Sequence, residues 1–141
     1  MKIKIPIVLI ELEDQNFHPV ISADVNGRKG NWIIDTGASK TVFDKNRTDD
    51  YILLDEIDEL HSVEAAEQPL NTDLAALKSI QFEDVFISKL KVAIIDLRHI
   101  NKIYKNSGGP EICGLIGSDF LYKYNAVINY NKKLLTLTIK P

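Results

Sequence analysis

The sequence has a single cysteine, Cys113, among its 141 residues, which excludes an internal disulfide. The apolar neighbours in "EICGLIG" indicate an inert, buried thiol and fit a reducing compartment. No apolar run is long enough to span a bilayer, and the N-terminus lacks the small-residue cleavage site of a signal peptide. A basic excess is also missing, because the formal net charge is −3 and the Lys and Arg residues are scattered. We therefore expect a cytoplasmic protein that binds neither nucleic acid nor membrane.

Clusters of metal-binding or nucleophilic residues are missing too. The three histidines, His18, His61 and His99, are far apart, and none has a second ligand at a metal-binding spacing. Neither Ser39 nor Cys113 has the sequence context of a catalytic nucleophile. We therefore expect no metal and no cofactor. The length and the apolar content of 45% are typical of one domain, which we predict to span residues 1–141.

What the sequence does contain is strand signals, that is, β-branched and aromatic runs separated by turns. Asn26-Gly27 between two apolar runs predicts a β-hairpin that ends in "WIID". Residues 104–111, "YKNSGGPE", are predicted to form a loop. "GSDFLYKY" is predicted to form a short helix, which Ser118 or Asp119 can cap. These patterns together predict a mostly β fold with one short helix near the C-terminus.

The strand "WIID" leads directly into Asp35 and the turn-forming pair Thr36-Gly37. Peptide hydrolysis by carboxylates needs two Asp side chains about 3 Å apart that share one proton, because like-charge repulsion prevents both from ionising. One carboxylate deprotonates water while the other protonates the scissile carbonyl. A tight turn that presents an Asp, a hydroxyl and a glycine supplies half of such a pair, although an isolated triplet is also an ordinary turn.

The stretch "IIDTGAS" resembles the active-site signature of the retropepsin-like aspartic proteases. The resemblance makes Asp35 the catalytic residue, and four neighbours form the active-site loop around it: Thr36, Gly37, Ala38 and Ser39. A second signature of this family is an apolar-apolar-Gly element that braces the loop and opens a short helix. "GLIGSDFL" resembles it, with Leu115, Ile116 and Gly117 as the bracing residues.

The resemblance spans most of the chain, from about His18 to Ile139, because "YNAVINYNKKLLTLTI" is similar to the closing hairpin of bacterial members. It implies a retropepsin-like (acid protease) β-barrel. No second Asp-Thr-Gly or Asp-Ser-Gly triplet is present, so a catalytic protein must be a homodimer in which each subunit gives one Asp35. The terminal segments "KIKIP" and "LLTLTI" are candidates for an inter-subunit sheet.

Within that dimer, the resemblance implies that Thr36 braces the loop of the partner and that the Gly37 carbonyl accepts a hydrogen bond from an extended peptide or protein substrate. Family members also close over the substrate with a glycine-rich flap. The candidate here has no glycine, and its tip comprises Glu64, Ala65, Ala66, Glu67 and Gln68. Alanines resist the positive-φ turns that glycine permits, so this flap departs from the family pattern.

A second departure concerns an ion pair of the viral members, which place an Asp two residues after the triplet glycine and an Arg after the downstream glycine. Ser39 and Ser118 occupy these positions here, so both partners are replaced together and no buried charge is left alone.

Two functions follow from the sequence. The first is an aspartic endopeptidase, and the second is a catalytically weak or inactive β-barrel that serves as a dimerisation or peptide-binding module. The intact "DTGAS" favours the enzyme, because a non-catalytic module has no need to hold two carboxylates at a repulsive axis.

Overall fold

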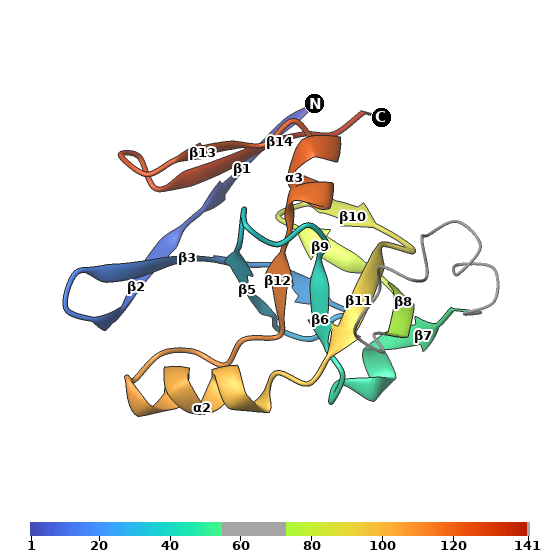
Figure 1. The fold of residues 1–141 in the computed structure, drawn as a ribbon. Helices are drawn as coiled ribbons and strands as arrows, with labels where there is room; N and C mark the ends of the chain where they lie inside the picture. The colour runs from blue at the N-terminus through green and yellow to red at the C-terminus, as the bar shows by residue number, and fades with distance from the viewer. Residues whose placement is uncertain (55–72, 141) are drawn as a thin grey trace.

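β-Strands dominate the computed structural model, which describes residues 1–54 and 73–140. Within these residues the strands form three sheets (Figure 1). The largest sheet has eight strands in the order β2 (Val8–Glu13), β3 (Asn16–Ser22), β5 (Asn31–Ile34), β12 (Gly114–Ile116), β6 (Val42–Asp44), β11 (Lys91–Ile95), β8 (Asp73–Leu77) and β7 (Tyr51–Leu53). One three-stranded sheet has the order β1 (Lys2–Pro6), β14 (Leu134–Thr138) and β13 (Val127–Asn129). The other has the order β10 (Val85–Ile87), β9 (Ile80–Phe82) and β4 (Asp24–Val25).

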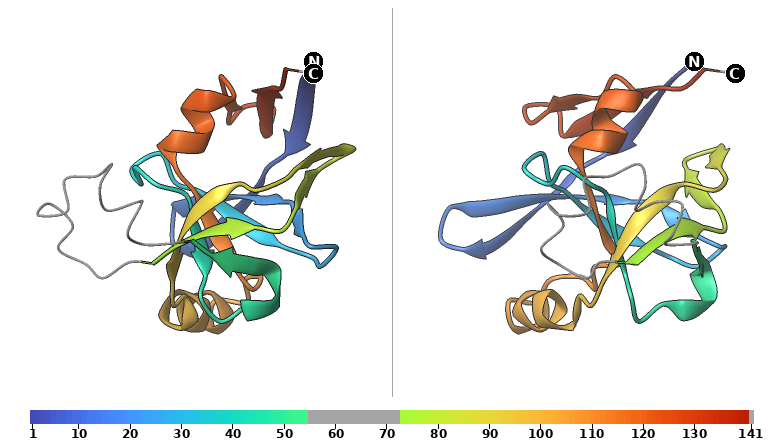
Figure 2. Two further views of the ribbon diagram at one scale, coloured as in Figure 1. Left: turned by 90° about the vertical axis from the view of Figure 1, so that its right-hand side faces the viewer. Right: turned by 45° about the vertical axis from the view of Figure 1, so that its right-hand side comes forward.

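Three short helical segments accompany the sheets: the 3-10 helix η1 (Thr48–Asp50), α2 (Arg98–Asn106) and α3 (Ser118–Lys123). The β1–β14–β13 sheet and both chain ends lie at one end of the molecule, with α3 beside them (Figures 1 and 2). Helix α2 lies at the opposite end, and the eight-stranded sheet lies between the two. The predicted mostly β fold is therefore confirmed.

The predicted hairpin before Asp35 is also confirmed. Asn26 and Gly27 both have positive φ, 53° and 76°, as a two-residue type I′ turn requires. Val25 and Arg28 exchange backbone hydrogen bonds across this turn, at 2.8 and 2.9 Å. Strand β3 then pairs antiparallel with β5. The Asn-Gly turn thus directs β5 through the centre of the sheet towards Asp35.

Strand β5 is held by the main core of the molecule. Its side chain Trp32 is fully buried, packs against the tilted ring of Phe43 with ring centroids 5.6 Å apart, and donates its indole N–H to the carbonyl of Ala23 at 3.0 Å. Gly114 of β12 lies directly under the indole, where a Cβ would approach the Trp32 ring to 2.4 Å. The large Trp32 indole therefore fills the space that Gly114 leaves free, and this packing fixes β5 against β12.

The terminal strands pair with one another inside the chain. β1 and β14 are antiparallel, with Lys2 opposite Thr138 and Pro6 opposite Leu134. Because β13 pairs with the other edge of β14, that strand has no free edge for an inter-subunit sheet. The strand formed by "LLTLTI" therefore cannot itself pair with a partner, whereas "KIKIP" forms β1, which has a free edge, as does β13. An inter-subunit sheet that extends from one of these edges stays a prediction.

Helix α3 begins at Ser118, as the sequence predicts, but its cap differs from the prediction. The N-cap position is occupied by Gly117, and neither Ser118 nor Asp119 makes a capping hydrogen bond. Helix α2 was not predicted, because the Gly-Gly-Pro sequence after it indicated a loop over residues 104–111. The helix extends to Asn106, so the loop begins later, where Gly108 adopts a φ of +76°.

Within residues 1–54 and 73–140, no helix has the length and apolarity needed to cross a membrane. The cytoplasmic location stays a prediction.

The single thiol is expected to be unreactive in the folded protein. Burial raises the pKa of the Cys113 thiol to about 12, so it stays protonated at pH 8. We expect a disulfide reagent such as dithionitrobenzoate at pH 8 to leave the native protein unmodified over minutes and to titrate one thiol per chain in guanidinium chloride. Rapid labelling of the native protein would contradict this placement.

Candidate active site

Asp35 lies at the end of a strand that is paired on both sides. β12 runs parallel to β5, with Leu115 opposite Ile33 and Ile116 opposite Ile34, and β3 is paired with the other edge of β5. The backbone N–H of Asp35 donates to the carbonyl of Ile116 at 2.9 Å, so the pairing extends into the first residue of the loop. The bracing element predicted from "GLIG" therefore lies beside the predicted catalytic loop, although the two are far apart in sequence.

The Asp35 side chain helps to shape its own turn. Its carboxylate Oδ1 accepts a hydrogen bond from the Gly37 N–H at 3.1 Å, and its carbonyl accepts one from the Ala38 N–H at 3.1 Å. Together they form an Asx turn inside a β-turn, a role for which Asp is well suited. Within the described residues, Oδ2 of Asp35 makes no hydrogen bond. Asp35 is half-buried, whereas Thr36, Gly37 and Ser39 are exposed.

Gly117 allows the second signature to approach this loop closely. A Cβ on Gly117 would lie 2.7 Å from the carbonyl carbon of Lys40, 2.8 Å from its oxygen and 2.9 Å from the carbonyl oxygen of Ala38. The next residue, Ser118, donates its backbone N–H to Ala38 at 2.7 Å. Only glycine fits this main-chain contact without displacing the loop. The bracing role predicted for Gly117 thus has a steric basis.

A buried hydrogen-bond network, which sequence reasoning missed, holds the far end of the loop. The fully buried Thr41 donates its hydroxyl to Oδ1 of Asp119 at 2.7 Å, and its backbone N–H reaches the same oxygen at 2.9 Å. The Thr41 hydroxyl in turn accepts the backbone N–H of Gly117 at 3.1 Å. Lys40 adds an ion pair to Asp119, with 3.8 Å between Nζ and Oδ2. We call the Thr41–Asp119–Gly117 network the loop clamp.

The loop clamp connects the loop to α3, near the place where viral members use an ion pair. Ser39 and Ser118 are linked only indirectly, through the backbone bond from Ser118 to Ala38. No sequence motif singled out Thr41. For Asp119 the only signal was an acidic residue at the start of a helix, which is common in any protein.

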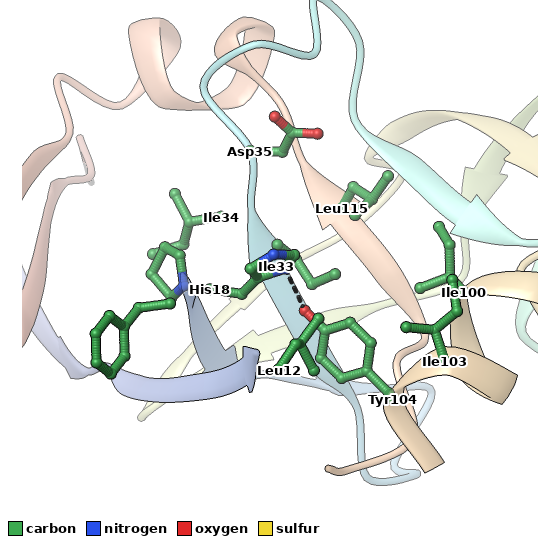
Figure 3. A pocket seen from close by; sticks show the side chains of 11 residues that line it. Leu12, His18, Ile33, Ile34, Asp35, Ile100, Ile103, Tyr104 and Leu115 are labelled. Carbon is green, nitrogen blue, oxygen red and sulfur yellow. Dashed lines mark hydrogen bonds between the residues drawn. The ribbon is translucent and has the colours of Figure 1, made fainter. Parts of the chain in front are cut away.

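An apolar cavity of about 400 Å³ opens directly beside Asp35 (Figure 3). Its walls come from β5, β12, α2 and the β2–β3 hairpin. Its lining residues are Leu12, Phe17, His18, Pro19, Ile33, Ile34, Asp35, Ile100, Ile103, Tyr104 and Leu115. Nδ1 of His18 and the Tyr104 hydroxyl are 2.7 Å apart and hydrogen-bonded, on the opposite side of the cavity from Asp35 (Figure 3). Burial raises the pKa of Tyr104 to about 12, so its hydroxyl is neutral at physiological pH.

The structure thus brings together two of the predicted groups, the loop from Asp35 to Ser39 and the bracing residues Leu115 to Gly117. The candidate flap residues, Glu64, Ala65, Ala66, Glu67 and Gln68, lie outside the described residues. In the part of the chain that is described, no group of three or more His, Cys, Asp or Glu side chains is arranged to hold a metal ion.

Comparisons with known proteins identify the family and the fold. The profile of a family described as aspartyl protease matches residues 21–120, which include the Asp35 loop and the bracing element. A retropepsin-like aspartic protease from Rickettsia conorii has a similar fold, with a TM-score of 0.51 and 20% identity over 97% of this chain and 89% of that one. The retroviral protease-like domain of Ddi1 from Leishmania major is also similar, with a TM-score of 0.53 and 12% identity over 86% of this chain and 95% of that one. A search among curated protein sequences gives no significant match.

The close contact at Gly117 predicts that adding a single methyl group there lowers the stability of the fold considerably. We expect Gly117→Ala to lower the free energy of unfolding by about 1–3 kcal/mol, because its Cβ would overlap main-chain atoms that cannot rotate away. Gly37→Ala is the matched control, since its Cβ would meet only Oδ1 of Asp35 at 3.4 Å. Denaturant unfolding at equal protein concentration measures both changes. Equal stability of the two variants would contradict the steric role of Gly117.

The loop clamp predicts that a hydroxyl matters more than a methyl group at position 41. Thr41→Val keeps the shape of the side chain but leaves the Gly117 N–H and the Asp119 carboxylate without the hydroxyl as a partner. We expect this to lower the free energy of unfolding by about 1–3 kcal/mol. Thr41→Ser keeps the hydroxyl and should cost less. Chemical denaturation ranks the stabilities of the wild type, Thr41→Ser and Thr41→Val. Amide hydrogen exchange at Gly117 should accelerate in the valine variant only. A valine variant as stable as the wild type would refute the clamp.

Proposed function

Because the chain belongs to the aspartyl protease family, we propose that it is an aspartic endopeptidase whose active site forms between two copies of the chain. The observation that carries the proposal is the Asp35 turn, fixed by the Ile116 carbonyl, the Gly117 contact and the loop clamp. Such a turn holds a carboxylate at a defined place in front of an apolar cavity. Catalysis by carboxylates depends on this kind of fixed geometry.

The chemistry needs a second Asp35 from the partner. In the proposed mechanism, the ionised Asp35 takes a proton from water while the water oxygen attacks the carbonyl carbon of the scissile bond. The protonated Asp35 of the other copy gives its proton to the carbonyl oxygen, and a neutral gem-diol forms. Transfer of one diol proton to the ionised carboxylate, and of a proton from the other carboxyl group to the amide nitrogen, then breaks the C–N bond. The products are a carboxylic acid and an amine, and the pair again shares one proton.

Two features of the isolated chain support a dimer with its axis at this loop. Thr36 is exposed and makes no side-chain hydrogen bond within the described residues, so its hydroxyl is available to a partner loop. On α3, one turn beyond the loop clamp, Tyr122 is 87% exposed. A large aromatic side chain exposed to this degree is typical of an interface. A two-fold axis would place identical loops face to face.

The same geometry suggests how a peptide is bound. The exposed Gly37 carbonyl is proposed to accept a main-chain hydrogen bond from an extended substrate, and the cavity beside Asp35 to receive a side chain. In this proposal the whole of residues 1–141 forms one protease domain.

The test is the substitution Asp35→Asn, with Asp84→Asn in the exposed β9–β10 turn as the matched control. Wild type should cleave a diverse peptide library with a bell-shaped dependence on pH, because the pair must carry one proton. Asp35→Asn should lower kcat/KM by at least about a thousandfold, because an amide cannot accept the proton of water. Sedimentation should give a dimer for all three proteins, since the amide removes like-charge repulsion without changing the shape of the side chain.

Cleavage that survives Asp35→Asn would show that the activity comes from elsewhere. A wild type that dimerises and binds peptides but cuts none would instead identify a non-catalytic peptide-binding module.

A further inference from the structure

The turn that precedes β5 contains a chemically labile pair of residues. Asn26 is the only asparagine in the sequence that is followed by glycine. Because glycine has no side chain, its backbone nitrogen can approach the side-chain amide of the preceding asparagine more closely than the nitrogen of any other residue can. Attack of that nitrogen on the amide carbon expels ammonia, which is one reason why asparagine counts among the thermolabile residues.

The folded turn leaves the reacting atoms accessible to solvent. Asn26 and Gly27 are both exposed, and a Cβ built on Gly27 would meet no atom within 4 Å. Within residues 1–54 and 73–140, the Gly27 N–H donates no hydrogen bond, whereas the Asn26 N–H donates to the carbonyl of Ser79 at 2.9 Å. Hydroxide can therefore remove the Gly27 amide proton without first breaking a hydrogen bond.

The turn also restrains the attack. Asn26 has the positive φ of a type I′ turn, and Val25 and Arg28 close this turn by two backbone hydrogen bonds. To form a ring, the Gly27 nitrogen must rotate about the Cα–C bond of Asn26, which separates Val25 from Arg28. The reaction should therefore proceed in the native protein, but more slowly than in the unfolded chain.

The side chain of Asn26 lies beside a buried carboxylate. Its Nδ2 donates to the carbonyl of Asp49 and to Oδ1 of Asp50, each at 3.4 Å. Asp50 is fully buried, accepts the Arg47 Nε–H at 2.9 Å and lies 3.6 Å from Nη1 of Arg28. A carboxylate in place of the Asn26 amide would lose both donated bonds and would bring a like charge against Asp50.

We propose that Asn26 is a site of spontaneous covalent modification, and that its conversion to isoaspartate or aspartate loosens the hairpin that carries β5. The Gly27 nitrogen bonds to the amide carbon of Asn26, and the side-chain nitrogen leaves as ammonia together with the Gly27 amide proton. Water then opens the succinimide ring at either carbonyl. One product is aspartate, and the other is isoaspartate, in which the main chain runs through the side-chain methylene.

Both products weaken the start of β5. Each adds one negative charge to the formal net charge of −3, next to Asp50. Isoaspartate also adds an atom to the main chain, so the Val25–Arg28 pair cannot keep the two-residue turn. The only co-reactant is water, and the proposal does not depend on the proposed protease function.

The first test ages the native protein near pH 8 and then digests it with pepsin in acid, which stops the reaction. Isoaspartyl methyltransferase with labelled S-adenosylmethionine is the probe for isoaspartate. The internal control is Asn131, which is exposed in the β13–β14 turn and is followed by Lys132. The peptide with Asn26 should gain isoaspartate at least about tenfold faster than the peptide with Asn131, because the side chain of lysine hinders the attacking nitrogen. The rate should rise with hydroxide concentration and should be higher in guanidinium chloride.

The second test measures what the modification does to the fold. The aged protein is separated by ion exchange, and the fraction with isoaspartate should unfold at a lower denaturant concentration than the unmodified fraction. Asn26→Asp should also lower this midpoint, whereas the matched control Asn131→Asp should not. Asn26→Gly, which keeps the turn and adds no charge, should lower the midpoint less than Asn26→Asp.

Native protein that forms no isoaspartate at Asn26 while the unfolded chain does would show that the turn protects this residue, and would overturn the proposal. Equal rates at Asn26 and Asn131 in the native protein would overturn it as well. If the modified and unmodified fractions unfold at the same midpoint, the proposed loosening of the hairpin is wrong. An Asn26→Asp variant as stable as Asn26→Gly would exclude repulsion from Asp50 as a cause.

Discussion

The arrangement of the candidate site depends on one contact, the approach of the Gly117 backbone to the carbonyls of Ala38 and Lys40. This contact is possible because β12 runs parallel to β5 and delivers Gly117 beyond the end of the strand that carries Asp35. Once the two main chains are this close, the Ser118 N–H meets the Ala38 carbonyl, and the Gly117 N–H meets the Thr41 hydroxyl. The turn that presents the carboxylate is thus fixed mainly by backbone atoms, which are less adaptable than side chains.

Much of this arrangement could be predicted because it depends on residues with special backbone properties. Asn26-Gly27 specifies a turn that few other pairs can adopt, and the Asp-Thr-Gly and apolar-apolar-Gly elements are short and sharply defined. Such local constraints can be identified in the sequence directly. The start of α3 at Ser118 was predicted for the same reason, although its cap was not.

The parts that were missed depend on contacts between distant residues. Thr41 and Asp119 are ordinary residues until the fold brings them together, so no local pattern marks them. Helix α2 is a different case, because Ile100, Ile103 and Tyr104 do follow helical spacing. The Gly-Gly-Pro sequence that follows indicates a loop over residues 104–111, but the helix extends into this range as far as Asn106. Its anchoring by Asn101 to Ile112 could not have been inferred from the sequence.

The pairing of β5 with β12 also constrains when the site can form during synthesis. A ribosome makes Asp35 long before it makes Gly117, and β1 pairs with β14, near the other end of the sequence. Contacts between such distant segments form late and slow the folding of a chain. A growing chain therefore carries an Asp35 loop that nothing yet braces, and the carboxylate acquires its fixed position only when β12 and α3 have emerged. The fold itself delays the assembly of the site until these later segments have been made.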